Sequence, residues 1–332
     1  MSSDLTFIDL CSGIGGGRLG LEQQGASCVA FSEIDSKAIK TYSLFYGDSD
    51  IALGDLTKVD ESIIPDVDLL IAGFPCQTFS IVGKRAGFDD IRGQIIFKIV
   101  NILKKKNIKY FILENVKGLK SVDKGNVLSS IVNLLDRAGY NVSWQIINSL
   151  NHGVPQKRER IYFVGIRKDL NLGDYIFPQA SCDIHYNLSD YLIDDSKEFI
   201  LDANSKKYST FLKYLNNKYN EGKYNLNSLL KEELLILDTR QSDLRLYRNE
   251  VPTLRTGRHG ILYVRNKQLR YLSGKEALLL QGFPISFLDK VKGVSNTALL
   301  SQAGNAMTVN VIFDIAKELI RLMDNVGIKK YG

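Results

Sequence analysis

The sequence predicts an α/β fold, with a doubly wound, mostly parallel sheet and a second, smaller domain. Three observations predict it. Short apolar runs alternate with helical patterns between residues 5 and 166. A glycine-rich turn, Cys11 to Gly17, follows the first apolar run. Several later runs end in an acidic residue or a cysteine, and open α/β sheets carry their chemistry at the carboxyl ends of the strands.

Apolar runs of strand length define the expected sheet, and longer amphipathic segments define its helices. The expected strands cover residues 5–10, 27–31, 51–53, 67–72, 108–113, 142–147 and 160–166. The expected helices cover residues 18–24, 36–46, 94–106 and 126–138. A last helix opens near Gly304, runs to about Met323, and has an apolar side that must pack on the first domain.

Beyond Asp169 the periodicity is lost, which indicates a change of domain. We therefore expect three segments: a first domain over residues 1–170, a second, smaller domain over 171–275, and a segment over 276–332 that returns to the first domain. Residues 238–275 contain nine Lys or Arg against three acids, a local charge of +6 that equals the net charge of the 332-residue chain. Because Tyr and His are interleaved, this segment suits a polyanion as well as it suits a solvated surface.

Composition excludes several classes of protein. Hydrophobic residues make up 44% and charged residues 24%, which is typical of globular proteins. No apolar run approaches the roughly 18 residues of a membrane span, and the first residues do not resemble an export leader. Four cysteines without a C-x-x-C pair, together with three histidines, predict neither a disulfide framework nor a metal site. A cytoplasmic, monomeric protein without a metal is therefore expected.

The glycine turn predicts a nucleotide-like cofactor, because glycines let a ligand approach the backbone closely. The segment from Gly15 to Gly20 even matches a dinucleotide fingerprint, with Glu33 near the expected acidic position. That pattern fits a nicotinamide or an adenosyl cofactor equally. A second carboxylate, Asp55, and a thiol, Cys76, favour the adenosyl alternative, since hydride transfer needs no thiol.

Topology brings the reactive groups together. In a doubly wound sheet the first, fourth and fifth strands are neighbours, about 4.8 Å apart. Their ends carry the glycine turn, Cys76 and Glu114, which would share one crevice. Alone, Cys76 would more often be a buried apolar residue and Glu114 a solvated one. Arg158 and Arg160 alternate at the start of a strand, so both should point to one face and could grip a phosphate or a carbonyl oxygen.

Taken together, these motifs resemble the DNA (cytosine-5)-methyltransferases of bacterial restriction-modification systems. The resemblance covers nearly the whole chain except residues about 170 to 240. It rests on Phe7–Gly16, Glu33–Asp35, Gly54–Asp55, Gly73–Ser80, Arg92–Gly93, Glu114–Val116, Gln156–Arg160, Gln281–Pro284 and Gly304–Asn305.

The resemblance implies methylation of C5 of cytosine in a short sequence of double-stranded DNA, using S-adenosyl-L-methionine. It implies that residues 1–170 form the catalytic and cofactor-binding domain, that residues 171–275 form the small target-recognition domain, and that residues 276–332 return to pack on the catalytic domain. The base would be flipped out of the duplex, Cys76 would add to C6, and Glu114, Arg158 and Arg160 would assist. The implied cofactor residues are Cys11, Gly13, Ile14, Gly15, Gly16, Glu33, Ile34, Asp55, Leu56, Gly73, Pro75, Ile95, Asn305 and Ala306. The implied DNA-contacting residues are Gln77, Ser80, Lys84, Arg85, Arg240, Arg255 and Arg258.

Three positions depart from the family pattern. Cys11 and Ile34 stand where many members have an aromatic residue near the cofactor, and Ala306 stands where a small hydroxyl residue is common. Residues 80–93, with basic residues at their centre, suit a lid that closes over DNA. We expect the Lys84→Ala/Arg85→Ala double variant to bind DNA more weakly.

Other functions stay open at this point. A related branch of the family modifies transfer RNA, although a separate recognition segment favours DNA. A non-catalytic DNA-binding module would not need Cys76, Glu114 and both arginines, and a nicotinamide dehydrogenase would not need the thiol. Base readout would belong to residues in roughly 170 to 260, and a cognate restriction endonuclease encoded nearby is a further partner that the resemblance suggests.

Overall fold

A computed structural model describes residues 5–75, 94–181 and 184–329 of the chain. Its backbone contacts divide the chain into two compact units. Unit 1 comprises Met1–Asn148, Glu159–Ala180 and Ala306–Gly332, and unit 2 comprises Ser149–Arg158 and Ser181–Asn305. The three segments expected from the sequence are defined by function rather than by contacts, and they stay a prediction.

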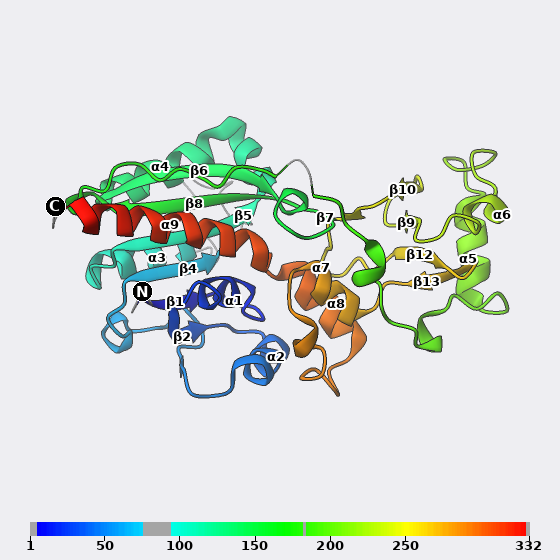
Figure 1. The fold of residues 1–332 in the computed structure, drawn as a ribbon, viewed down its shortest axis with the longest axis horizontal. Helices are drawn as coiled ribbons and strands as arrows, with labels where there is room; N and C mark the ends of the chain where they lie inside the picture. Colours follow the sequence, from blue (N-terminus) through cyan, green and yellow to red (C-terminus); the bar gives the residue numbers. More distant parts are fainter. Residues whose placement is uncertain (1–4, 76–93, 182–183, 330–332) are drawn as a thin grey trace. The chain divides into compact units, whose positions relative to one another are not determined.

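Among the described residues, seven strands form the central sheet of unit 1, in the order β3-β2-β1-β4-β5-β8-β6 (Figure 1). The predicted adjacency of the first, fourth and fifth strands is confirmed. All neighbouring strands from β3 to β5 are parallel, whereas β8 runs antiparallel to both β5 and β6. The strands are β1 (Thr6–Leu10), β2 (Ser27–Ser32), β3 (Ile51–Ala52), β4 (Leu69–Gly73), β5 (Tyr110–Val116), β6 (Tyr140–Asn148) and β8 (Glu159–Arg167).

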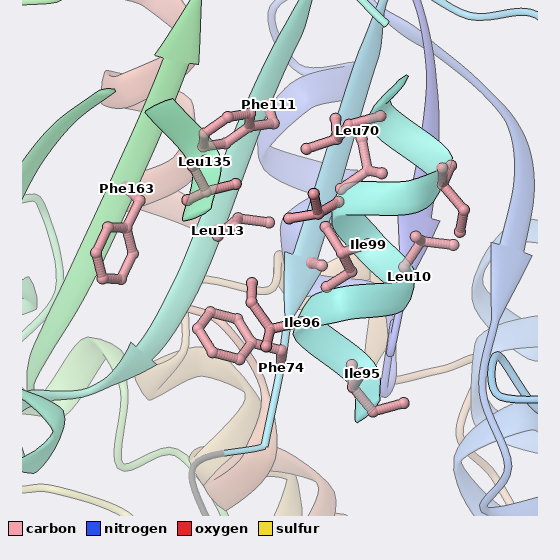
Figure 2. Packing of buried hydrophobic residues seen from close by; sticks show 14 of the residues in the cluster. Leu10, Leu70, Phe74, Ile95, Ile96, Ile99, Phe111, Leu113, Leu135 and Phe163 are labelled. Atoms are coloured by element: carbon pink, nitrogen blue, oxygen red, sulfur yellow. The ribbon is translucent and has the colours of Figure 1, made fainter. Parts of the chain in front are cut away.

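Side chains alternate across the sheet, so its two faces build two separate cores. On one face, Leu10, Leu70 and Phe111 pack against the apolar sides of two helices, α3 and α4 (Figure 2). On the other face, Phe7, Ile71 and Ile112 pack with residues of α1 and α9. The helices of unit 1 are α1 (Gly16–Glu22), α2 (Ser36–Tyr46), α3 (Gln94–Lys105), α4 (Asn126–Arg137) and α9 (Val309–Lys329).

Local sequence explains where these helices begin and end. Asp35 caps α2, because its side chain accepts hydrogen bonds from the amides of Lys37 at 2.8 Å and Ala38 at 3.4 Å. Lys104 and Lys105 lie in the last turn of α3, where a cation interacts favourably with the helix dipole. Short 3₁₀ segments, including η1 (Glu61–Ile63) and η3 (Lys117–Gly125), connect the elements.

Unit 2 has its own small core, formed by a four-stranded sheet in the order β10-β9-β12-β13 and by helix α5. Ser273 begins α7 with a capping box, in which its hydroxyl and the Glu276 carboxylate each accept a hydrogen bond from the other's backbone amide. The described elements are β7 (Gln156–Lys157), α5 (Lys206–Leu215), α6 (Leu226–Leu229), β9 (Ile236–Asp238), β10 (Arg245–Tyr247), β11 (Val251–Pro252), β12 (Ile261–Arg265), β13 (Gln268–Tyr271), α7 (Gly274–Leu280) and α8 (Asn296–Asn305).

The region around residue 158 differs from the expectation. Both arginines were expected on one strand, but β7 ends at Lys157 and β8 begins at Glu159. Arg158 therefore lies in the break between two strands and belongs to unit 2, whereas Arg160 belongs to unit 1. Strand β7 pairs with β11, a partner from residues 251–252 that sequence periodicity did not indicate.

Candidate active site

The glycine turn connects β1 to α1 through backbone conformations that few residues adopt. Gly13 and Gly15 have φ values of 57° and 78°, and Cys11 has a φ of 52° although it is not glycine. The hydroxyl of Tyr46 donates a 2.6 Å hydrogen bond to the carbonyl of Gly15. A Cβ atom on Gly15 would lie 2.4 Å from the same tyrosine ring, so only glycine fits beneath it.

Glu33 lies against the glycine turn, as its position after the second strand suggested. One carboxylate oxygen accepts a 2.8 Å hydrogen bond from the amide of Gly13. The other accepts from the amides of Ile34 and Asp35, at 2.7 and 2.9 Å. Next to it, the Ile34 side chain is 74% exposed, so an apolar surface is left uncovered beside the turn.

Asp55 follows the third strand and is half-buried. Its Oδ1 atom accepts hydrogen bonds from the hydroxyl and the amide of Thr57, at 2.7 and 3.0 Å, and these bonds lower the pKa of the Asp55 carboxyl. Leu56 turns inward and is only 2% exposed. Ile95, in the first turn of α3, is a member of the same core.

Two buried polar side chains near the turn were missed in the sequence. Among the described residues, neither oxygen of Asp9 has a hydrogen-bond partner within normal distance, and the same is true of the Ser12 hydroxyl. Burial raises the pKa of Asp9 to about 8, against the opposing charge of Arg18. The signal was a carboxylate within an otherwise apolar strand, which is costly unless a partner compensates it.

Glu114 and Arg160 form the second part of the site. In the sheet register, Glu114 lies beside Gly73 of β4 and beside Tyr162 of β8. The Arg160 Nε atom lies 3.0 Å from the Glu114 Oε1 atom, and both side chains are nearly buried. Within the described part of the chain, Oε1 nevertheless has no partner with hydrogen-bond geometry. A buried acceptor is thus held in place with part of its bonding capacity available.

The segment that leads to Cys76 is held by Asn115. Its amide nitrogen donates a 2.9 Å hydrogen bond to the carbonyl of Phe74, and its amide oxygen accepts one from the amide of Val116. Pro75, which follows, is exposed. The remaining predicted residues of this segment, namely Cys76, Gln77, Ser80, Lys84 and Arg85, lie outside the described residues.

Arg158 is buried in unit 2, with 2% of its surface exposed. Its Nη1 atom donates to the carbonyls of Leu254 and Gly304, at 3.2 and 3.1 Å. Asn305, the next residue after Gly304, is exposed and hydrogen-bonded to the hydroxyl of Thr256. Arg158 therefore joins two backbone segments, an arrangement typical of a residue that positions its neighbours.

The three arginines expected to contact DNA lie in different environments within unit 2. Arg240 forms a two-pronged ion pair with Asp238, at 2.7 and 2.8 Å, and is almost completely buried. Its Nη1 atom also donates to the carbonyl of Thr253. Arg255 and Arg258 are exposed, on either side of Gly257. The geometry thus favours a structural role for the first and leaves the other two available to a polyanion.

The described ranges support neither a membrane span nor a metal site. No helix there is long and apolar enough to cross a membrane. In the same residues, no group of three His, Cys, Asp or Glu side chains is arranged to hold a metal ion.

Comparison with known proteins agrees with this geometry. The family model for C-5 cytosine-specific DNA methylases matches residues 5–321. The chain is 38% identical to the type II methyltransferase M.BsuFI of Bacillus subtilis, over 98% of this chain and 76% of that protein. It is 36% identical to the type II methyltransferase M.HhaI of Haemophilus parahaemolyticus, over 94% of this chain and 93% of that protein.

The solved structures extend the likeness to the fold. An S. pombe Dnmt2 methyltransferase superposes with a TM-score of 0.67 at 19% identity, over 96% of this chain and 99% of that one. The predicted α/β fold of the S-adenosylmethionine-dependent methyltransferases is thereby confirmed. The glycine turn, the acidic residues that follow β2 and β3, the glutamate within β5, and the family match lead to one conclusion: this chain belongs to the C-5 cytosine-specific DNA methylase family and is a DNA (cytosine-5)-methyltransferase.

Proposed function

We propose that this enzyme methylates C5 of a cytosine within a short, specific sequence of double-stranded DNA, through a covalent adduct between Cys76 and C6 of a flipped base. The observation that carries the proposal is the Glu114–Arg160 pair. Its members come from adjacent strands, and Gly73, beside Glu114 in the sheet, is three residues before Cys76. A thiol, a carboxylate and a guanidinium can therefore converge on one small planar base.

The residues around the glycine turn fit S-adenosyl-L-methionine. Neither oxygen of the buried Asp9 carboxyl has a hydrogen-bond partner within normal distance among the described residues, and the charge of Arg18 offsets only part of the cost of burial. A cationic ligand would offset more of it. Glu33 suits ribose hydroxyls, Asp55 suits the adenine amine, and the exposed Ile34 suits an apolar ring face. When bound, the cofactor supplies an electrophilic methyl group. The remaining proposed cofactor residues are Cys11, Gly13, Ile14, Gly15, Gly16, Leu56, Gly73, Pro75, Ile95, Asn305 and Ala306.

The protein side chains would prepare the base for methylation. C5 of cytosine is a poor nucleophile, and addition of the Cys76 thiolate to C6 gives it the character of an enamine carbon. Glu114 would hold N3 and favour its protonation as negative charge develops, while Arg160 would donate to the base carbonyl. After C5 accepts the methyl group, loss of the C5 proton re-forms the ring double bond and expels Cys76.

Arg158 would act indirectly, by holding the backbone at Leu254 and Gly304. Arg255 and Arg258 would contact DNA, together with Gln77, Ser80, Lys84 and Arg85 from the segment outside the described residues. We assign Arg240 to the support of that surface, because its charge is already satisfied by Asp238. A role in a restriction-modification system, a cognate endonuclease encoded nearby, a monomeric state and a cytoplasmic location belong to the same proposal.

Bisulfite sequencing of plasmid DNA from expressing cells tests the reaction and reveals the target. The wild type should methylate cytosine in one short sequence, and Cys76→Ala should methylate none. Glu114→Gln should be slower by about 10²-fold or more, the usual contribution of a positioned proton donor. Glu159→Gln is a matched control, because Glu159 lies at the start of β8, where its exposed side chain pairs with Lys117, and its replacement should leave the rate unchanged.

An oligonucleotide with 5-fluorocytosine at that target tests the adduct. Fluorine replaces the proton that must leave C5, so elimination of Cys76 is blocked and a stable crosslink should form in the presence of cofactor. Tight binding without any crosslink would refute the covalent mechanism. Methyl transfer to transfer RNA but not to plasmid DNA would instead identify transfer RNA as the substrate.

A further inference from the structure

The loop between β3 and β4 carries two of the proposed cofactor residues but little regular structure. Residues 54–60 form turns that lead into η1. On its inner side, Leu56 and Val59 are buried in the core that also contains Ile95 and Ile96 of α3. Beside it, an open groove of about 470 Å³ is lined by Thr57 of the loop and Phe97 of α3, among others. Apolar packing therefore supports this loop from one side.

Polar contacts from α3 to Glu61 supply the rest of the support. Lys98 Nζ lies 2.8 Å from Glu61 Oε1, and Lys105 Nζ lies 3.1 Å from Glu61 Oε2. Asn101 Nδ2 donates a weaker hydrogen bond of 3.3 Å to Oε1. The three donors follow helical spacing, so they share one face of α3. Glu61 itself is only 9% exposed, which strengthens each charged contact relative to one in water.

Lys98 joins the carboxylate to the loop backbone. The same Nζ atom that contacts Glu61 donates a 2.5 Å hydrogen bond to the carbonyl of Val59. One ammonium group thus holds the side chain of Glu61 and the main chain two residues earlier. The hydrogen bonds from Lys98 and then Lys105 lower the pKa of Glu61 to about 2, so the carboxylate stays charged throughout the physiological range.

We propose that Glu61 is a positioning residue for cofactor binding: its contacts with Lys98 and Lys105 hold the 54–60 loop against α3. Asp55 and Leu56 on the loop, and Ile95 on the helix, are thereby kept at a constant separation. The inference rests on the proposed cofactor role of these residues. It assigns Glu61 no contact with the cofactor itself.

The test compares Glu61→Gln with wild type by hydrogen exchange and by calorimetric binding of S-adenosylhomocysteine, the unreactive product. Glutamine keeps the size of the side chain but loses the charge that attracts both lysines. Amides of residues 54–60 should exchange faster in the absence of ligand. The Kd for S-adenosylhomocysteine and the KM for S-adenosylmethionine should rise about tenfold, whereas kcat at saturating cofactor should change less than twofold.

Two further variants make the test specific. Asp136, on α4 of the same unit, forms an ion pair of similar length with Lys168. Asp136→Asn removes that pair and should leave the amide exchange of residues 54–60 and the Kd for S-adenosylhomocysteine at wild-type values. Lys98→Gln removes the ammonium group on α3 that contacts Glu61 and should reproduce the Glu61→Gln result. The double variant should be much less impaired than the sum of the two, because both changes remove one interaction.

The outcomes separate this inference from the proposed function. Unchanged amide exchange at residues 54–60 in Glu61→Gln and Lys98→Gln would overturn the inference. Faster exchange with an unchanged Kd for S-adenosylhomocysteine would overturn it as well. A fall in kcat with an unchanged KM would also overturn it, because it would place Glu61 in the chemistry. If the wild type itself does not bind S-adenosylhomocysteine, the proposed function fails, and the positioning role fails with it.

Discussion

The carboxyl group of Asp9 lies in a strand whose neighbours are apolar. Phe31 and Ile71 lie beside it on the two adjacent strands, and Ile8 and Leu10 flank it along the chain. Burial raises its pKa to about 8, so the carboxyl is largely neutral at pH 6 and becomes charged as the pH rises. A group whose folded pKa lies above its unfolded value favours folding at low pH and loses that contribution as the pH rises through the folded pKa.

We therefore predict that Asp9→Asn flattens the pH dependence of stability. In the wild type without ligand, the Asp9 contribution to the free energy of unfolding should fall between about pH 4 and pH 8, by roughly 5 kcal/mol. The variant should lose that slope, because an amide does not titrate. Urea unfolding at several pH values measures the difference, and parallel curves for the two proteins would contradict the prediction.

Asp9→Asn should also bind cofactor more weakly, since the wild-type carboxylate is the proposed partner of a cation.

At the scale of the element, the glycines of α1 serve packing. A Cβ atom on Gly16 would lie 2.3 Å from the carbonyl oxygen of Met307, and one on Gly20 would lie 2.7 Å from the Cβ atom of Ile312. Such distances would force backbone or helix to shift. Within the fingerprint-like segment that begins at Gly15, Gly20 therefore permits close contact between α1 and α9.

Gly20→Ala should accordingly destabilise the protein by about 1–3 kcal/mol, through overpacking against α9. Gly118→Ala is a suitable control, because nothing lies within 4 Å of its Cβ position and its φ is not positive. Thermal unfolding should show a clear loss of Tm for the first variant and little change for the second. Equal Tm values would mean that α9 can move away without cost.

At the scale of the whole molecule, the three arginines of unit 2 that were expected to contact DNA fall into two groups. Arg240 is neutralised by the buried Asp238, so its charge is not available to a ligand. Arg255 and Arg258 are exposed. DNA affinity depends on the release of counterions by such exposed charges, and it falls as salt rises.

Replacing both exposed arginines by glutamine should lower DNA affinity and reduce the slope of log K against log salt by about 1–2. A Lys317→Gln/Arg321→Gln variant removes the same charge from the exposed side of α9 in unit 1 and should leave the slope unchanged. Fluorescence anisotropy over a salt series gives both slopes. A similar loss in both variants would indicate a general effect of net charge rather than a contact surface.

Local pattern was sufficient for most of unit 1. Helix α2 lies where it was predicted, because Asp35 caps it and Gly47 follows it, and both are signals contained in a few adjacent residues. The adjacency of β1, β4 and β5 could also be predicted, because strands and helices alternate along the chain and a doubly wound sheet places these three strands side by side. The motifs that identify the family are likewise contiguous in the chain.

Long-range contacts decided the rest. The break at Arg158 depends on β7 pairing with a strand that lies nearly a hundred residues later. Arg240 pairs with Asp238, only two residues before it, but its guanidinium also donates to the carbonyl of Thr253, which lies further along the chain. The sequence shows Asp9 as a polar residue in a strand. That its oxygens lack a hydrogen-bond partner among the described residues follows only from the positions of its neighbours. Thus the chain's short segments determine which elements form and which chemistry they carry. Only the folded arrangement determines which charges are already satisfied, because pairing depends on the direction of each side chain and on contacts between segments that are distant in the sequence.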